Sequence, residues 1–283
     1  MRGMKITDSS LWKRAAVILI FAPLLTGIFW QRGIVMFLFL AGVNFLGQRE
    51  LYLMLKDSLR FSQFLIISVM GFLLLCGAFW GGADHLVAIL TVSLILNFII
   101  EIVSKTDHKL RNVTFSLFAT VYPAVFITFL FMIENLPLTF YGPDRHLILL
   151  VILFAVWFFD IGSYLAGSFL GRHRFFPDIS PKKTIEGFIG GIISVLIMGA
   201  VMGSFISTSA RGHVLTIAIL SGLAGQVGDL SESIIKRSLD CKDSSNLIPG
   251  HGGILDRFDS LFFAGPAVYV YLVICSMYFG SSY

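Results

Sequence analysis

Charged side chains are scarce in this sequence of 283 residues and make up only 13% of it. Average soluble domains carry about 25% charged residues. Hydrophobic residues make up 56% of the chain, and the mean hydropathy is +0.85. This composition excludes an ordinary soluble enzyme, and we expect a polytopic membrane protein instead.

Cysteine is scarce as well, with Cys76, Cys241 and Cys275 the three in the chain. No two of them have the spacing of a metal-binding or redox motif. Cys76 and Cys275 lie in apolar segments, where a thiol packs as a small hydrophobic group. The sequence therefore predicts neither a disulfide framework nor a cysteine metal site.

Long stretches without Asp, Glu, Lys or Arg predict the membrane spans, because a helix needs about 20 apolar residues to cross the hydrocarbon core. A membrane β-barrel would need strands of alternating polarity, which these runs lack. We predict an all-α polytopic integral membrane protein of about nine transmembrane helices. They are expected at residues 14–31, 33–54, 61–82, 85–104, 112–133, 146–170, 187–207, 212–236 and 259–280.

Basic residues are nearly absent from every second loop, where only Arg32, Arg145 and Arg211 occur. The other 18 of the 21 lie in the N-terminal tail and after the second, fourth, sixth and eighth predicted spans. Cytoplasmic loops carry an excess of Lys and Arg, so we expect a cytoplasmic N-terminus and a C-terminus outside. The net charge of +4 then indicates lipid head groups rather than nucleic acid.

Polar chemistry is concentrated in the second half of the chain. We expect residues 1–145 to form an N-terminal transmembrane region, and residues 146–283 a C-terminal transmembrane catalytic region with cytoplasmic-side loops 171–186 and 237–258. An ionisable residue at membrane depth costs about 2.5–3.5 kcal/mol on insertion scales and marks a functional candidate. The candidates in this half are Asp160, Glu186, Asp229, Asp256 and Asp259.

The eighth predicted span contains GQVGDLSESIIKRSL at residues 225–239. At helical spacing Asp229, Ser233, Lys236 and Arg237 fall on one broad face, with Glu232 one step to the side. An acid deep in the span with two bases nearer the cytoplasm forms a polar stripe. The alternative interpretation is an internal ion pair with snorkelling Lys and Arg side chains.

The next segment reads CKDSSNLIPGHGG at residues 241–253, and its Pro-Gly and Gly-Gly pairs predict a loop. Glycine lets backbone amides approach an anion closely. Asp256 and Asp259 follow one turn apart at the start of a helix, where they can hold magnesium. The alternative is a helix N-terminus whose dipole favours acids. His251 alone indicates a hydrogen-bonding loop residue rather than a base.

A further polar segment, DISPKKTIEGFIGG, occupies residues 178–191. Ser180 or Thr184 can cap the helix that follows, with Glu186 in its first turn. Lys182 and Lys183 add positive charge at this helix N-terminus, which favours phosphate binding. The alternative is a capped helix with positive-inside lysines. The spacing of a P-loop is absent.

These segments place acids, bases and glycine turns on one side of the membrane. Magnesium with Lys, Arg and backbone donors is typical of phosphoryl and nucleotidyl transfer. Because the acids lie at the lipid boundary, the pattern predicts chemistry that joins a cytosolic phosphate compound to a lipid.

The pattern Ser233-x-x-Lys236-Arg237, Lys242-Asp243 and His251-Gly252-Gly253-x-x-Asp256-Arg257-x-Asp259 resembles the signature of phosphatidate cytidylyltransferases, the CDP-diacylglycerol synthases. Upstream, Ser180-Pro181-Lys182-Lys183-Thr184-x-Glu186-Gly187 is similar to a second segment of that family. Asp160, followed by Gly162 and Tyr164, resembles an acidic residue before it. The resemblance covers residues 157–265, and the first half matches only as a hydrophobic multi-span region.

The resemblance implies that CTP and phosphatidate give CDP-diacylglycerol and pyrophosphate with Mg²⁺, a second cation being left open. It implies a multi-pass protein of the cytoplasmic (inner) membrane with its active site facing the cytoplasm. The expected catalytic residues are Asp229, Lys236, Arg237, Asp256 and Asp259, of which the three aspartates are the candidate metal ligands. The expected substrate-binding residues are Ser180, Lys182, Lys183, Thr184, Glu186, Ser233, Lys242, Asp243, His251, Gly252, Gly253 and Arg257, with Glu186 expected to orient a lysine.

Two other classes of function stay open at this point. A transporter or channel also uses intramembrane acids, but it needs them along a path across the bilayer. Another lipid-linked phosphotransferase is closer in chemistry, although the DGxxAR signature of CDP-alcohol phosphotransferases is absent. The expected partners are CTP and membrane phosphatidate, with no nucleic acid. Gly-rich spans permit close helix packing, which leaves a homodimer open.

Overall fold

The computed structural model of the chain describes residues 8–56, 59–81, 84–136, 147–206, 210–248 and 252–279, with side chains of the first helix described from residue 19. These residues are mainly helical and form no strand, only the isolated bridges Arg174–Thr184 and Ile248–Gly252. The prediction of an all-α polytopic membrane protein is confirmed.

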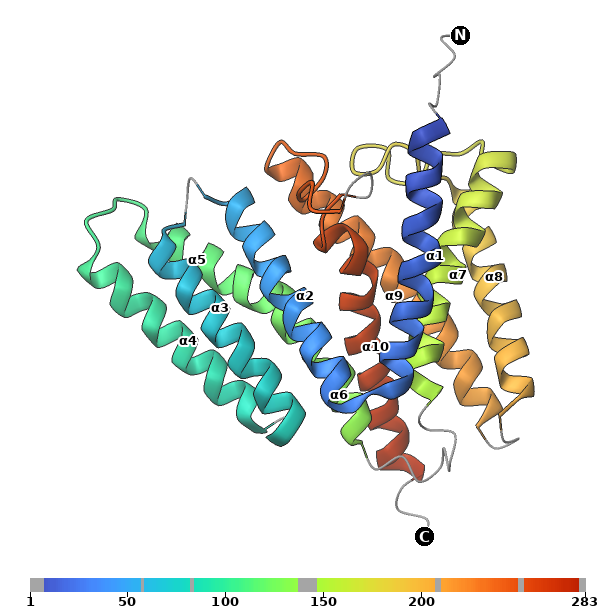
Figure 1. The fold of residues 1–283 in the computed structure, drawn as a ribbon, viewed down its shortest axis with the longest axis horizontal. Helices are drawn as coiled ribbons and strands as arrows, with labels where there is room; N and C mark the ends of the chain where they lie inside the picture. Colours follow the sequence, from blue (N-terminus) through green and yellow to red (C-terminus); the bar gives the residue numbers. More distant parts are fainter. Residues whose placement is uncertain are drawn as a thin grey trace.

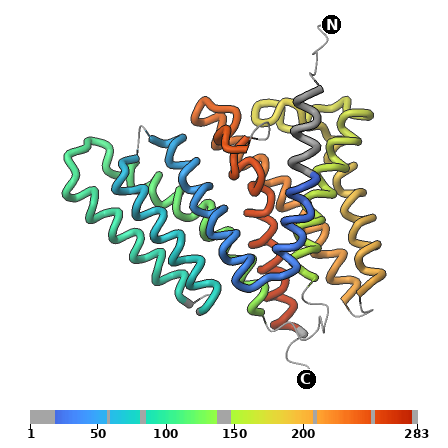
Figure 2. Tube along the Cα trace, viewed as in Figure 1, coloured from blue at the N-terminus to red at the C-terminus, as the bar shows by residue number. Residues whose placement is uncertain are grey.

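The helices follow one another with short connections (Figures 1 and 2). Two of them, η1 and η2, are single π-helical turns that continue an α-helix. The elements are α1 (Asp8–Gln31), α2 (Gly33–Met54), α3 (Phe61–Cys76), η1 (Gly77–Gly81), α4 (Asp84–Val103), α5 (Lys109–Thr120), η2 (Val121–Val125), α6 (Phe126–Asn135), α7 (Ile148–Leu170), α8 (Ile185–Ser204), α9 (Arg211–Ser238) and α10 (Leu255–Phe279).

Each of the nine predicted spans coincides with a helix. Within the described ranges, eight helical stretches are long and apolar enough to cross a membrane. One of them is the composite helix Lys109–Asn135, in which Pro123 lies inside the π-turn η2. Proline lacks an N–H and clashes with the preceding helical turn, so it accounts for the local change of helix type. The remaining predicted span coincides with α1, in which Leu19–Gln31 is a shorter apolar stretch.

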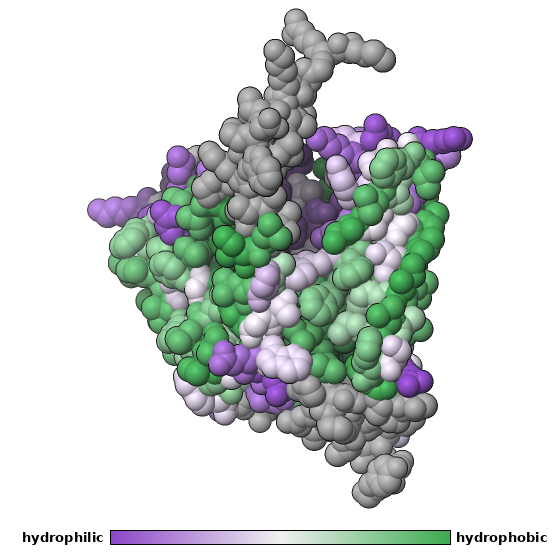
Figure 3. All heavy atoms as spheres, turned by 45° about the vertical axis from the view of Figure 1, so that its right-hand side comes forward, coloured by the Kyte–Doolittle hydropathy of each residue, from purple (hydrophilic) through white to green (hydrophobic). Residues whose placement is uncertain are grey.

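The connections after α2, α4, α7 and α9 all lie at the upper end of the bundle in Figure 1. These connections and the adjoining helix ends carry most of the basic residues counted in the sequence. In the space-filling view, hydrophilic residues lie at both ends and a broad hydrophobic band lies between them (Figure 3). The alternation of basic loops therefore corresponds to one physical end of the molecule.

The C-terminal helices pack most closely, with α7 against α8 and α9, and α9 against α10. α10 also packs against α6 and α7 and so joins the two halves of the chain. Fully buried side chains such as Phe159 on α7 and Phe262 on α10 fill this core. α4 packs chiefly against α3, α5 and η1 at the edge of the bundle (Figure 1). The site residues thus lie on the most tightly packed helices.

Candidate active site

The polar side chains of the C-terminal helices meet near the upper end of the bundle, in two adjacent groups. One group is the Lys236 cluster, which we define as Glu232 and Lys236 of α9 and Asp256 of α10. The other group lines a cavity between α7, α8, α9 and the loop before α8. Asp229 belongs to the cavity and lies about one helical turn from Glu232 on α9, so the two groups adjoin.

Lys236 is the centre of its cluster and is largely buried. Its Nζ lies 2.6 Å from Glu232 Oε2 and 2.5 Å from Asp256 Oδ1. Glu232 precedes Lys236 by four residues, which is the favourable order for a helical ion pair. A buried charge is tolerated only when it is paired, so one lysine here serves two acids.

Asp256 also organises the loop between α9 and α10. Its Oδ2 accepts hydrogen bonds from the backbone N–H of Ser244 (2.9 Å), the hydroxyl of Ser244 (2.9 Å) and the N–H of Gly253 (2.8 Å). Asp256 lies in the first turn of α10, where an acid is favoured by the helix dipole. The expected acid at the start of the helix is therefore confirmed for Asp256, whereas Pro249 and Gly250 of the expected loop lie outside the described residues.

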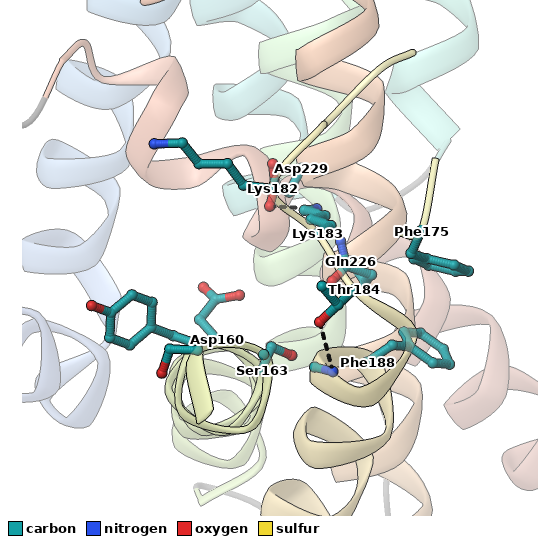
Figure 4. Close-up of a pocket in the computed structure, with 13 residues that line it drawn as sticks. Asp160, Ser163, Phe175, Lys182, Lys183, Thr184, Phe188, Gln226 and Asp229 are labelled. Atoms are coloured by element: carbon teal, nitrogen blue, oxygen red, sulfur yellow. Dashed lines mark hydrogen bonds and ion pairs between the residues drawn. The ribbon is translucent and has the colours of Figure 1, made fainter. Parts of the chain in front are cut away.

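The cavity has a volume of about 420 Å³. Polar groups from three elements line it (Figure 4): Asp160 and Ser163 of α7, Asp229 and Gln226 of α9, and Lys182, Lys183 and Thr184 of the loop before α8. Lys183 Nζ lies 2.7 Å from Asp229 Oδ2. Lys182 lines the cavity but is exposed and extends away from this pair in Figure 4. A cavity with two lysines and a helix N-terminus at its wall is suited to an anionic ligand.

Thr184 is the N-cap of α8, as one of the two sequence alternatives expected. Its side-chain oxygen accepts a hydrogen bond of 3.1 Å from the Gly187 N–H. Glu186 does not contact a lysine within the described residues, which corrects that expectation. It accepts hydrogen bonds from the N–H groups of Arg172 and His173, and its Oε1 lies 2.6 Å from His173 Nδ1. Glu186 therefore connects the loop after α7 to the first turn of α8 through hydrogen bonds.

Asp259 is buried where α9 crosses α10, and its Oδ1 accepts the N–H of Ser260. A Cβ on Gly228 would clash with the Asp259 carbonyl oxygen, so only glycine allows this approach of the two helices. Asp229, Glu232 and Asp160 all lie within electrostatic range of Asp259. Acids of α7 and α9 thus act electrostatically on the buried Asp259 of α10.

The remaining predicted site residues are placed less centrally. Arg237 is exposed and donates to the Cys241 carbonyl near the end of α9, while Lys242 and Asp243 are exposed in the loop. Arg257 lies within electrostatic range of Asp160. Ser180 and Ser233 are not among the described residues that line the cavity. Gly252 lies in the loop with a φ of +82°, a conformation that favours glycine. His251 lies outside the described residues.

Three residues of the site have a role that was not predicted from sequence. Glu232 was set aside from the polar stripe, although its spacing of four from Lys236 was a usable signal. Glu50 of α2 accepts hydrogen bonds from the α9–α10 loop, and Ser244 bridges Glu50 and Asp256. Glu50 was visible in sequence only as an acid near the end of a predicted span.

The donor chemistry of this site suits a magnesium ion, which prefers hard oxygen ligands. Within the described part of the chain, however, no three His, Cys, Asp or Glu side chains form a common metal group. Both oxygens of Asp256 already have hydrogen-bond or ion-pair partners. Magnesium is often held by one or two carboxylates together with substrate phosphates and water. Asp229 lines the cavity with one carboxylate oxygen paired to Lys183, and the buried Asp259 lies within electrostatic range of it.

The chain is similar to several phosphatidate cytidylyltransferases. A phosphatidate cytidylyltransferase of Staphylococcus saprophyticus is 34% identical over 262 residues, which cover 90% of this chain and 95% of that protein. One of Staphylococcus aureus strain COL is 40% identical over 173 residues, 61% of this chain and 64% of the relative. One of Bacillus subtilis strain 168 is 36% identical over 191 residues, 67% of this chain and 68% of the relative. Residues 12–275 match the model of the cytidylyltransferase family, and the chain belongs to that family.

Proposed function

We propose that the protein transfers a cytidylyl group from CTP to phosphatidate and forms CDP-diacylglycerol and pyrophosphate. The observation that carries the proposal is the cavity with Lys182 and Lys183 beside the acids of α7 and α9, at the basic end of a membrane bundle. The membership of the family and the names of the relatives support the same substrates.

In the proposed reaction, an oxygen of the phosphatidate phosphate attacks the α-phosphorus of CTP. A new P–O bond forms, the bond to the β-phosphate bridging oxygen breaks, and pyrophosphate leaves with that electron pair. The attacking phosphate is already an anion near neutral pH, so no strong general base is required. The protein's contribution is to align two anions and to neutralise their charge.

The residues of the cavity suit this task in different ways. Lys183 is held by Asp229 at 2.7 Å and is therefore a fixed cation, whereas the exposed Lys182 extends into solvent. The capped N-terminus of α8 adds oriented backbone N–H groups. We propose that phosphate groups of the substrates bind between these lysines and the first turn of α8.

We also propose that Mg²⁺ is required and that Asp229 and Asp259 would hold it, with Asp256 acting mainly through Lys236. The ion would supply charge neutralisation at the reacting phosphates. We propose that the protein lies in a bacterial inner membrane and that the basic end of the bundle faces the cytoplasm, where CTP is available. A homodimer stays a prediction.

The test is pyrophosphate release by purified protein in detergent with CTP, magnesium and phosphatidate, each omitted in turn. The proposal expects release only when all three are present, together with CDP-diacylglycerol. Release without phosphatidate, or a folded protein that is inactive with all three, would contradict it.

A further inference from the structure

Glu50 is a buried acid of α2, in the N-terminal half of the chain. It lies near the C-terminal end of α2 and is only 1% exposed. Its Oε1 accepts hydrogen bonds from the Ser245 hydroxyl (2.6 Å) and the Ile254 N–H (2.9 Å). Its Oε2 accepts from the Ser244 hydroxyl (2.9 Å) and the Leu255 N–H (2.9 Å). One carboxylate therefore makes four contacts with the connection between α9 and α10.

These contacts compensate a negative charge that is costly inside a membrane protein. Within the described residues, none of the ion pairs involves Glu50. Its compensation comes instead from hydroxyl groups and from N–H groups at the start of α10, where the helix dipole favours an acid. Glu50 thus fixes the position at which α10 begins.

The same contacts connect Glu50 to the Lys236 cluster. The Ser244 hydroxyl lies 2.9 Å from both Glu50 Oε2 and Asp256 Oδ2, and its single proton can serve either acid. A Cβ on Gly253 would clash with Ser244 Oγ and lie 2.5 Å from Glu50 Oε2. A shift of Glu50 would therefore move the loop whose Ser244 and Gly253 donate hydrogen bonds to Asp256.

We propose that Glu50 is a positioning residue of the transferase site, which holds the start of α10 so that Asp256 pairs with Lys236. The inference rests on the proposed function. It assigns a part in the chemistry to α2, which carries none of the residues of the family signature quoted above. Glu50 itself acts through Ser244 and the backbone of α10 and does not touch the cavity as described.

Glu101 of α4 provides a matched control. It is also a buried carboxylate and is 2% exposed. It accepts hydrogen bonds from Gln63 and Asn112 and forms an ion pair with Arg60. α4, which carries Glu101, packs chiefly against α3, α5 and η1 at the edge of the bundle, away from α9 (Figure 1). If buried acids had only a structural role, substitution of Glu50 and substitution of Glu101 would have similar effects on activity.

The experiment compares the wild type with Glu50→Gln and Glu101→Gln in detergent. Glutamine keeps the volume of Glu50 but replaces one acceptor oxygen with a donor that faces a hydroxyl and an N–H. We expect kcat of Glu50→Gln to fall about 100-fold, the effect of a displacement of about 1 Å at the reacting groups, with KM changed by less than about threefold. Glu101→Gln keeps the wild-type kcat.

Hydrogen–deuterium exchange provides a second readout that does not depend on activity. In Glu50→Gln, the amides of Ile254 and Leu255 should exchange at least about tenfold faster, because their acceptor is weakened. The same amides should be unchanged in Glu101→Gln. Ser245→Ala removes one of the four contacts and should lower kcat less, and it should add little in the Glu50→Gln background.

The outcomes separate the two claims. An inactive wild type rejects the proposed function, and the exchange measurement then decides whether Glu50 fixes the loop. Glu50→Gln with wild-type kcat, or with unchanged exchange of Ile254 and Leu255, overturns the inference while the proposed function stands. Equal losses of kcat in Glu50→Gln and Glu101→Gln would also overturn it, because the effect would then be general.

Discussion

Lys236 on α9 and Asp256 on α10 are separated by 20 positions in the sequence, yet their side chains form an ion pair of 2.5 Å. Glu232 contacts the same ammonium group from the preceding turn of α9. The pair fixes one helix against the other at the point where the cavity adjoins the cluster. The ion pair gives Lys236 a role in packing α9 against α10, and variants of Lys236 should separate its effect on stability from its proposed role in catalysis.

Lys236→Met should lower the free energy of unfolding by about 3–5 kcal/mol, because two largely buried acids lose their cation. Adding Glu232→Gln should recover part of this loss, since it removes one uncompensated charge. Thermal unfolding in detergent measures both effects, with Lys242→Met as the control on an exposed lysine. If Lys236→Met unfolds at the temperature of Lys242→Met, the cluster does not stabilise the fold.

The adjacent lysines of the cavity should differ in their effect on catalysis. Lys183→Met removes a cation held by Asp229 and should lower kcat/KM about 100-fold, as expected for a fixed electrostatic group. Lys182→Met removes an exposed charge, which salt screens, and should mainly raise KM at low ionic strength. Steady-state rates at two salt concentrations test this, and equal effects of both substitutions would contradict the assignment.

Gly228 should be required for the packing of α9 against α10, whereas Gly212 of the same helix should tolerate substitution. Gly228→Ala forces a Cβ against the Asp259 carbonyl and should separate α9 from α10, with a cost of about 1–3 kcal/mol in stability and a clear loss of activity. A Cβ on Gly212 meets no atom within 4 Å, so Gly212→Ala should be neutral or stabilise by about 0.5–1 kcal/mol. The two thermal midpoints provide the comparison, and equal midpoints would argue against a close helix crossing.

Thr184 should act as a helix cap that serine can replace. Thr184→Ala should cost about 1 kcal/mol of stability, because the Gly187 N–H loses its acceptor. Thr184→Ser keeps the hydroxyl and should retain most of the stability and the activity. If both variants were equally destabilised, the methyl group rather than the cap would be the important feature.

Removal of Mg²⁺ should abolish turnover and leave the fold intact. Lys183 and Lys236 already compensate acids of the site, so the thermal midpoint without CTP should not change on chelation. Activity measured with and without a chelator, then after magnesium is restored, tests the requirement. A chelator-insensitive rate would reject the proposed cofactor.

Much of the fold could be predicted from sequence, because bilayer thickness and charge placement constrain helices strongly. All nine predicted spans coincide with helices, and the 33–54 span matches α2 at both ends. The π-turns were not predicted, since periodicity does not distinguish one extra residue in a turn. The ninth span was predicted from residue 259, whereas α10 begins at Leu255, because Asp256 and Arg257 belong to the helix although they interrupt the apolar run.

The site was predicted in part. Thr184, Asp229, Lys236 and Asp256 lie where the local patterns placed them, at helix starts and along α9. Which cation pairs with which acid depends on the crossing of α7, α9 and α10, and no local pattern specifies that. The ion pair of Lys183 with Asp229 and the hydrogen bonds of Glu50 both join residues that are far apart in the sequence, so they depend on how the helices pack.

The most direct test of the central claim follows the α-phosphate of CTP. Labelled CTP, phosphatidate and Mg²⁺ are incubated with the wild type and with Asp256→Asn, and folded protein is quantified in both. The account predicts that the wild type transfers the α-phosphate label to CDP-diacylglycerol, while Asp256→Asn stays folded and forms none. A label that stays in water-soluble products with the folded wild type, or product formation by Asp256→Asn at the wild-type rate, would contradict it.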